Sequence, residues 1–305
     1  MRGAPDMAGD LVGAIEAGGT KFVCAVGTAG GGPLEAVTLP TRDPDSTFEE
    51  VGAFFRAMSR RGRLRALGIG SFGPLDLEPG SATYGQILRT PKPGWAGVNL
   101  IARARSIGNM PVALDTDVNA AALAEIAAAG SEVRNLAYVT VGTGIGVGLV
   151  IDGKPVHGLG HPEVGHMLVR RHPAHDGFDG ICRFHGDCLE GLASGPAIEA
   201  AAGMPASSVP AGHPLWIAQA WYLAQLCSNL LLTVAPHRIV LGGGVMHQDH
   251  LFDAVRRMTI DLLGGYLTSV SEANIHEVIG PPRCGAPSGL VGALLLGGRV
   301  ASERG

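Results

Sequence analysis

The sequence predicts an α/β fold of two lobes, each of which opens with a β-hairpin closed by a glycine-rich turn. Apolar runs flank the turn 17–21 in the segment 11–26, and the same arrangement returns around the turn 142–146 in the segment 136–151. Two β-rich runs separated by a glycine turn are typical of a hairpin. The chain has 305 residues, which is longer than one small core requires. The repeat therefore favours duplicated halves with nucleotide held between them, although two such hairpins also occur by chance in α/β proteins.

The other expected elements fit the same class, because short apolar runs alternate with segments rich in alanine and leucine. Strands are expected in the segment 67–74, which ends in a loop, and at 111–115 and 238–241; helices are expected at 119–129, 214–234 and 288–296. We expect a lobe boundary near residue 116. Residues 1–116 would form a small N-terminal lobe, on which the C-terminal helix (288–305) packs, and residues 117–287 would form a larger lobe.

Composition excludes several classes of protein. The net charge of -4 is spread along the chain and offers no basic face for nucleic acid, and the arginines of 56–65 indicate a solvated helix end. Residues 1–10 lack the apolar core of a signal peptide, and the apolar run 215–234 is interrupted by two glutamines and an asparagine. We therefore expect a cytoplasmic protein without nucleic-acid or membrane partners. The large side chains of 214–234 favour core packing first and a homodimer interface second.

The clearest chemical signal is a set of two histidines and two cysteines. These are His166, Cys182, His185 and Cys188, the last three at intervals of three residues in a glycine-rich segment. Two thiolates and two imidazoles can complete a tetrahedral zinc shell that leaves no open position, so the site would be structural. Idle thiols or a redox pair are the alternative. A metalloprotease is not expected, because His161 and His166 are five residues apart and Pro162 opposes a helix.

Asp117 follows an expected strand and precedes an expected helix. A carboxylate at the carboxyl end of a strand could accept the proton of a sugar hydroxyl that attacks phosphorus. The competing interpretation is a helix cap. The turn at 18–21 lacks the spacing of a P-loop, but its backbone N–H groups, like those of 142–146, could still contact phosphates.

In order along the chain, these segments resemble the repressor–ORF–kinase (ROK) family of sugar kinases and regulators, and within it the bacterial zinc-containing fructokinase branch. The resemblance is collinear from about residue 11 to residue 297. It depends on the motifs at 16–26, 70–76, 90–95, 115–123, 142–148, 161–166, 188–196 and 242–246. Several independent motifs in the same order are more specific than any one of them.

The resemblance implies an actin-like, ribonuclease-H-like duplicated fold with a sugar cleft between the lobes. It implies transfer of phosphate from Mg-ATP to a hexose, most closely D-fructose, to give fructose 6-phosphate. Asp117 would be the catalytic base. The sugar would contact Gly73, Glu163, His166 and Glu190. The nucleotide and its phosphates would contact Gly19, Thr20, Lys21, Thr143, Gly144, Pro196, Gly243, Gly244 and Val245. Zn²⁺ would bind His166, Cys182, His185 and Cys188, which fixes the sugar-binding loop.

Four positions differ from the wider family. Glu16 replaces a common Asp, and the zinc loop has the spacing Cys-x-x-His-x-x-Cys; both favour fructokinases. Thr116 replaces a common Asn, which disfavours glucose or N-acetylmannosamine. The segment 284–289 lacks the usual Asn or Asp before its helix. Three alternatives remain: a glucose or mannose kinase of the same family, a sugar-sensing regulator, and a non-catalytic sugar-binding protein. A regulator is not expected, because the roughly ten residues before the first strand are too few for a DNA-binding domain.

Overall fold

The computed structural model describes residues 10–28 and 32–303, and the chain forms two units. Unit 1 contains the described residues up to Ala128, the segment Lys154–His161, and the described residues from Cys284 onward. Unit 2 contains Ala129–Gly153 and Pro162–Arg283. Residues 1–10, in which no signal peptide is expected, lie almost wholly outside the described residues. The last two residues of the expected C-terminal helix also lie outside them.

Unit 1 contains a five-stranded mixed sheet in the order β3-β2-β1-β4-β5. The strands are β1 (Asp10–Ala17), β2 (Lys21–Gly27), β3 (Pro33–Pro40), β4 (Arg63–Ser71) and β5 (Val112–Thr116). The predicted first hairpin is confirmed, because β1 and β2 pair antiparallel around the glycine turn, and β3 extends it. β4 and β5 continue the sheet in parallel from the other edge of β1, so the carboxyl ends of three strands meet at one edge.

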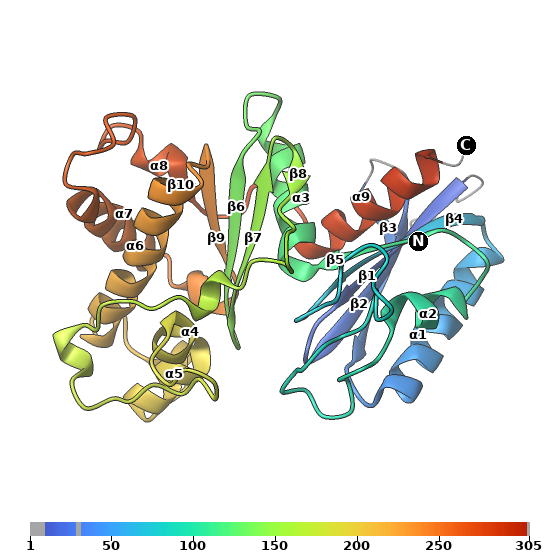
Figure 1. Cartoon of the computed structure of the whole chain (residues 1–305), viewed down its shortest axis with the longest axis horizontal. Helices are drawn as coiled ribbons and strands as arrows, with labels where there is room; N and C mark the ends of the chain where they lie inside the picture. Colours follow the sequence, from blue (N-terminus) through green and yellow to red (C-terminus); the bar gives the residue numbers. More distant parts are fainter. Residues whose placement is uncertain (1–9, 29–31, 304–305) are drawn as a thin grey trace, which may run out of the picture. The chain divides into compact units, whose positions relative to one another are not determined.

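Helices cover both faces of this sheet, because apolar side chains of β1 alternate between them. Leu11 and Ile15 face a cluster that includes Phe55 of α1 (Pro44–Ser59), whereas Val12 and Ala14 belong to the cluster of α9 (Ser288–Ser302). Figure 1 shows α9 lying along the sheet of unit 1. The short α2 (Leu100–Arg105) and α3 (Asp117–Ala129) complete the helices of this unit.

Close packing of α9 requires glycine at its contacts. A Cβ atom on Gly68 of β4 would lie 1.9 Å from the carbonyl oxygen of Ala293, and one on Gly292 would lie 1.7 Å from that of Ala120 in α3. The C-terminal helix therefore belongs to the same packed unit as the first sheet, as does α3, which the expected boundary at residue 116 assigned to the other lobe.

Unit 2 repeats the topology of unit 1. The second sheet has the order β10-β9-β6-β7-β8, which read in reverse matches β3-β2-β1-β4-β5 strand for strand; its short edge strand β8 begins the segment Lys154–His161 that is grouped with unit 1. The strands are β6 (Leu136–Val141), β7 (Ile145–Ile151), β8 (Lys154–Pro155), β9 (Arg238–Gly242) and β10 (Ile279–Gly280). As in unit 1, the central strand has an antiparallel hairpin partner on one side and a parallel strand on the other. The duplicated, actin-like α/β fold is thus present.

The helices of unit 2 lie mainly beside the sheet, and Figure 1 shows α6 (Leu215–Thr233) and α7 (His250–Leu263) on the same side of it. The smaller elements are α4 (Leu189–Ala193), α5 (Gly195–Ala202), α8 (Ile275–Val278) and the 3-10 turns Val164–His166, Pro173–His175, Ala206–Ser208 and Gly244–His247. The predicted core helix at 214–234 is confirmed by α6, whose residues are mostly buried.

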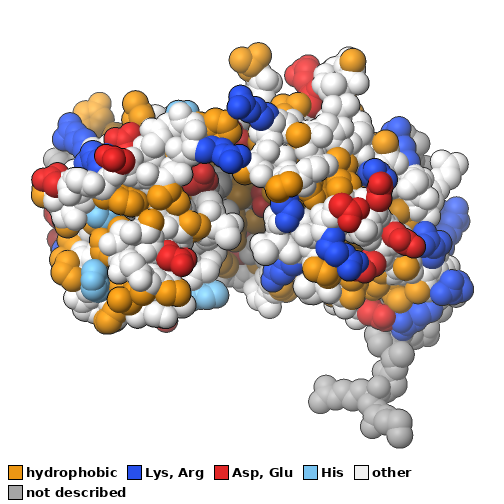
Figure 2. Space-filling view, turned by 90° about the horizontal axis from the view of Figure 1, so that it is seen from below, with side chains coloured by type: hydrophobic (Ala, Val, Ile, Leu, Met, Phe, Trp, Pro, Cys, Tyr) orange, Lys and Arg blue, Asp and Glu red, His pale blue; other side chains and the backbone are white. Residues whose placement is uncertain are grey.

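The surface is mixed in charge. On the face seen in Figure 2, lysine and arginine side chains are interspersed with aspartate and glutamate over the described residues. Several of the arginines near the end of α1 and the start of β4 pair with acidic residues; Arg61 contacts Glu35, and Arg65 lies 3.7 Å from Asp10. Within the described part of the chain, no helix is both long enough and apolar enough to span a membrane.

Candidate functional site

The first glycine turn presents its backbone to solvent. The Gly18 N–H donates to the Lys21 carbonyl at 3.0 Å, which closes the turn, and Thr41 holds it from outside by donating its hydroxyl to the Gly18 carbonyl at 2.7 Å. Gly19, Thr20 and Lys21 are exposed, and a Cβ atom on Gly19 would meet nothing within 4 Å. An anion can therefore approach the N–H groups of this turn closely.

Asp117 lies at the edge where β1, β4 and β5 end, and it is the first residue of α3. A Cβ atom on Gly70 would lie 3.4 Å from the Asp117 Cα atom, so only a small residue fits beside it. The helix is capped by Thr116, whose hydroxyl accepts the Asn119 N–H at 3.1 Å. The Oδ1 atom of Asp117 accepts the N–H of its neighbour Val118 at 2.9 Å. Thr116 therefore provides the cap at the third N–H of the helix.

Glu16, at the end of β1, adds a second carboxylate to this edge. Burial raises its pKa above the ordinary value, the charge of Asp117 raises it further, and Lys21 opposes both. A Cβ atom on Gly289 would lie 2.5 Å from the Oε1 atom of Glu16, so glycine at this position leaves room for the carboxylate. Two carboxylates beside an open glycine turn form a site suited to a hard divalent cation and its phosphate ligands.

The predicted nucleotide residues of unit 2 come together around the second glycine turn. The Gly195 N–H, at the start of α5, donates to the Gly142 carbonyl at 2.7 Å, which places Pro196 beside the turn that contains Thr143 and Gly144. Gly243 (φ +89°) lies so close to Val141 that a Cβ atom would be 2.5 Å from its carbonyl oxygen. The three segments 142–146, 195–196 and 243–245 thus form one backbone-lined surface within unit 2.

The four predicted metal ligands also meet. One ligand atom of each of His166, Cys182, His185 and Cys188 lies within 4.8 Å of the others. The His166 Nδ1 atom is 3.4 Å from the Cys188 Sγ atom, and the Cys182 Sγ atom is 3.7 Å from Nδ1 of each histidine. Zinc bonds of about 2.0 Å to nitrogen and about 2.3 Å to sulfur place tetrahedral donors roughly 3.3–3.8 Å apart, so the donor set fits zinc.

Glu190 links this cluster to the second glycine turn. It lies in the first turn of α4, two residues after Cys188, and its Oε2 atom accepts the Ile145 N–H at 3.0 Å. Its Oε1 atom is 4.0 Å from the His166 Nε2 atom, on the side of the imidazole away from the sulfurs. The pKa of Glu163 is raised mainly by desolvation; His166 opposes the increase and Glu190 adds to it. Three predicted sugar residues, Glu163, His166 and Glu190, are therefore neighbours.

Sequence analysis missed the residues that support the edge of unit 1. Asp115 is 3% exposed, and its Oδ1 atom accepts from Asn119 Nδ2 at 2.8 Å and from His157 Nε2 at 3.1 Å. The hydrogen bond from His157 to Asp115 raises the pKa of His157. His161 accepts the Leu75 N–H through Nε2 at 3.0 Å. Local sequence gave no signal for these contacts, because their partners are 42 and 86 residues distant.

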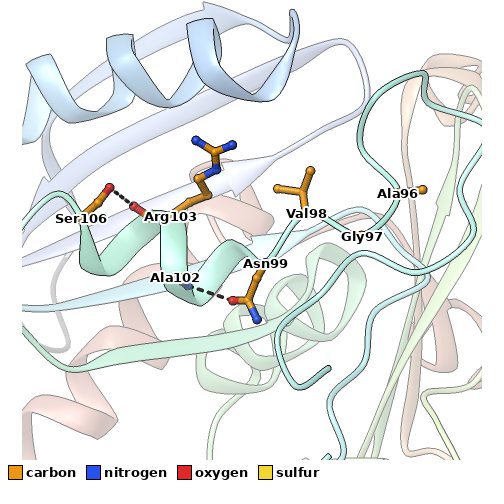
Figure 3. Close-up of a pocket in the computed structure, with 7 residues that line it drawn as sticks. All are labelled: Ala96, Gly97, Val98, Asn99, Ala102, Arg103 and Ser106. Atoms are coloured by element: carbon orange, nitrogen blue, oxygen red, sulfur yellow. Dashed lines mark hydrogen bonds between the residues drawn. The ribbon is translucent and has the colours of Figure 1, made fainter. Parts of the chain in front are cut away.

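A pocket at the surface of unit 1 contains none of the predicted residues. It has a volume of about 430 Å³ and is lined by Ala96, Gly97, Val98, Asn99, Ala102, Arg103 and Ser106 (Figure 3). Its polar groups are engaged locally: Asn99 Oδ1 accepts the Ala102 N–H at 2.8 Å, and Arg103 pairs with Asp45 at 2.6 Å. These contacts cap and brace α2, so the pocket is a by-product of the loop that leads into it.

The chain is similar to known proteins along nearly its whole length. The model of the ROK family matches residues 12–299. A fructokinase of Streptococcus mutans is 41% identical over 96% of this chain and 99% of its own length, and a fructokinase of Pediococcus pentosaceus is 40% identical over 94% of this chain and 97% of its own length. The crystal structure of a ROK hexokinase from Thermus thermophilus superposes with a TM-score of 0.76 at 28% identity and covers 97% of this chain and 100% of that one. The chain belongs to the ROK family.

Proposed function

We propose that this protein is an ATP-dependent fructokinase, which converts D-fructose to fructose 6-phosphate. Relatives that bear this name are about 40% identical over nearly the whole chain. The single structural observation that carries the proposal is the position of Asp117, a carboxylate at the carboxyl edge of a sheet and at the start of a helix that Thr116 caps.

Asp117 acts as the general base. Phosphoryl transfer requires little covalent help from protein; it needs an aligned acceptor, neutralised charge and a place for the proton. The sugar hydroxyl at carbon 6 attacks the γ-phosphorus of ATP, its proton passes to the Asp117 carboxylate, and the bond from phosphorus to the ADP oxygen breaks. The exposed backbone of 18–21 and the surface formed by 142–146, 195–196 and 243–245 contact the phosphates and the nucleotide.

Magnesium enters with ATP and supplies charge neutralisation at the phosphates. The chain's own contribution is the carboxylate pair of Glu16 and Asp117, since carboxylate oxygens are ligands that Mg²⁺ prefers. Burial and the charge of Asp117 raise the pKa of Glu16, and a cation bound near both carboxylates would oppose this by favouring the charged form.

Zinc is structural in this proposal. His166, Cys182, His185 and Cys188 would hold it with all four donors, and the glycine-rich segment between them has little core of its own. With Nδ1 of His166 facing the sulfurs, Nε2 is held toward Glu190 and the sugar. Loss of zinc would therefore impair sugar binding and local order together.

We also propose that the enzyme is cytoplasmic and homodimeric. α6 exposes Ile217 (53%) near its start and Leu232 (49%) near its end, on a helix that is otherwise mostly buried, and these two side chains could contact a second copy. Sedimentation equilibrium checks this point; a monomer at micromolar concentration would contradict it.

A sugar panel tests the proposal. ADP release is measured with fructose, mannose and glucose, each with and without a zinc chelator, and the zinc content of the purified protein is determined. We expect fructose to give the highest kcat/KM, and chelation to raise KM for the sugar and lower the melting temperature. Preference for glucose or mannose would favour the other kinases of the family, and binding without turnover would favour a sugar sensor. Full activity in protein that contains no zinc would refute the structural clamp.

The base is tested by Asp117→Ala and Asp117→Asn. Turnover should fall by orders of magnitude while fructose binding, measured calorimetrically, changes only a few-fold. Asp253→Asn is the matched control, since this carboxylate is 91% exposed on α7 and pairs with Arg256. Near-normal turnover in both Asp117 variants would remove this residue as the base.

A further inference from the structure

The loop that carries Gly73 contains a buried N–H group whose acceptor is a side chain rather than the backbone. Leu75 is 2% exposed, and its N–H donates to the Nε2 atom of His161 at 3.0 Å. The neighbouring N–H groups of the loop use carbonyl acceptors: Phe72 donates to Ala17 at 2.9 Å, and Asp76 donates to Gln86 at 2.9 Å. The imidazole thus completes the hydrogen bonding of a loop that is otherwise held by main chain.

The same ring packs against Gly73 itself. A Cβ atom on Gly73 would lie 3.3 Å from both the Cε1 and Nε2 atoms of His161, which is closer than ordinary van der Waals contact allows. The ring therefore lies over the Gly73 backbone while it accepts from Leu75. Because Nε2 is the acceptor, the proton of the neutral imidazole is on Nδ1.

His161 is well placed to keep this orientation. It precedes Pro162, which restricts the backbone of both residues to extended or turn conformations. Glu163 follows directly. The hydrogen bond to Leu75 thus fixes the chain just before one proposed sugar residue and fixes the loop around another, Gly73.

We propose that His161 is a positioning residue for the sugar site: it holds the Gly73 loop at the position from which its backbone contacts the hexose. This inference rests on the proposed function, because it assigns Gly73 to the sugar. Without the imidazole acceptor, the buried Leu75 N–H would have to move toward water, and Gly73 would move with it. Sugar affinity depends on such small displacements, because hydroxyl partners must lie within hydrogen-bond distance.

The test compares three substitutions that differ in where they place an acceptor. His161→Leu fills the space of the ring but has no acceptor. His161→Gln puts Oε1 the same number of bonds from the Cα atom as Nε2, and His161→Asn puts Oδ1 one bond short. KM and kcat are measured for fructose and ATP in the full-length enzyme. Hydrogen exchange of the Leu75 amide is followed in the same proteins by NMR, a readout that does not depend on turnover.

We expect KM for fructose to rise about tenfold in His161→Leu and His161→Asn, which corresponds to about 1.4 kcal/mol of binding free energy. kcat and KM for ATP should stay within about threefold of the wild type, since neither Asp117 nor the nucleotide surface is touched. His161→Gln should restore most of the fructose affinity and the protection of the Leu75 amide. His276→Leu, a histidine of α8 whose side chain is 58% exposed and which lies outside the proposed site, controls for loss of a histidine as such.

An unchanged KM for fructose in His161→Leu would overturn the positioning role, as would equal behaviour of the Gln and Asn variants. If His161→Leu does not fold, the Gln and Asn pair still decides, because both side chains are polar amides. If the wild type prefers another hexose, the same comparison is made with that sugar and only the fructose assignment is lost. A wild-type protein that phosphorylates none of the three sugars would overturn both the proposed function and this inference.

Discussion

Glu190 offers a sharp test of how the metal-bound loop and the phosphate turn are connected. Its Oε2 atom accepts the N–H of Ile145, a residue only 4% exposed, and a Cβ atom on Gly144 would lie 2.6 Å from the same oxygen. The carboxylate therefore holds the turn 142–146 from one side while its other oxygen faces His166. A residue assigned to the sugar from its motif is in direct contact with the proposed phosphate site.

The perturbation is Glu190→Ala, with Glu190→Gln as its partner. A hydrogen bond from an N–H group to a charged acceptor contributes about 1.5–3 kcal/mol net, and its loss leaves the Ile145 N–H unsatisfied. If the whole of this free energy is lost from ATP binding at the turn 142–146, the affinity for ATP falls about 10- to 150-fold. Glutamine keeps a neutral acceptor, which contributes about 0.5–1.5 kcal/mol, so part of the loss should be recovered. Glutamine also removes the negative charge that faces His166, so the affinity for fructose should not be recovered.

The assay measures KM for ATP at saturating fructose and KM for fructose at saturating ATP. We expect Glu190→Ala to raise both values by at least tenfold, and Glu190→Gln to raise KM for fructose while KM for ATP stays within a few-fold of the wild type. Glu199→Ala, an exposed carboxylate on α5, is the matched control. An unchanged KM for ATP in Glu190→Ala would refute the link to the phosphate turn and leave Glu190 as a sugar residue alone.

Two further predictions concern packing and pH. Gly292→Ala would place a methyl group 1.7 Å from the Ala120 carbonyl oxygen, so α9 must move away from α3; we expect a loss of about 1–3 kcal/mol in denaturant unfolding, whereas Gly212→Ala, with nothing within 4 Å, should change little. His157→Gln removes a group whose pKa is raised by its hydrogen bond to Asp115. A raised pKa stabilises the fold below the unfolded value of about 6.5 and stops doing so as pH rises through the folded value. The melting temperature of the wild type should therefore exceed that of His157→Gln most at about pH 5.5 and least at about pH 8.5; a constant difference across this range would contradict the assignment.

The fold could be predicted largely from local patterns, because each glycine hairpin is a contiguous segment with its own apolar alternation. The same holds for the candidate metal cluster, in which Cys182, His185 and Cys188 are close in sequence. β3 and α1 were not predicted: the alternating exposure of β3 is that of a half-exposed strand, and its residues Pro33 and Pro40 obscure the pattern. The expected boundary near residue 116 differs from the grouping of α3 with unit 1, and local patterns could not show the close approach of Gly292 in α9 to the Ala120 backbone of α3.

Residues whose role depends on distant partners could not be found from one sequence. The segment before α9 illustrates the reason. It lacks the Asn or Asp expected at that place, and sequence analysis therefore left its polar role open. The structure supplies the carboxylate from elsewhere: Glu125 of α3, 1% exposed, accepts the Ser288 hydroxyl at 2.6 Å and the Cys284 N–H at 3.3 Å.

This contact has a consequence for the site, because α3 begins with Asp117. Glu125 accepts from the first side chain of α9 and from the segment before it, so it ties α9 to the helix that carries the proposed base. The carboxylate missing from 284–289 is thus supplied by a helix about 160 residues earlier in the chain, and α3 is held at two places along its length. Thr116 and Asp115 fix its first turn, and Glu125 fixes its third. Precision at Asp117 therefore depends on residues that never contact a substrate, and these are the residues that local motifs cannot reveal.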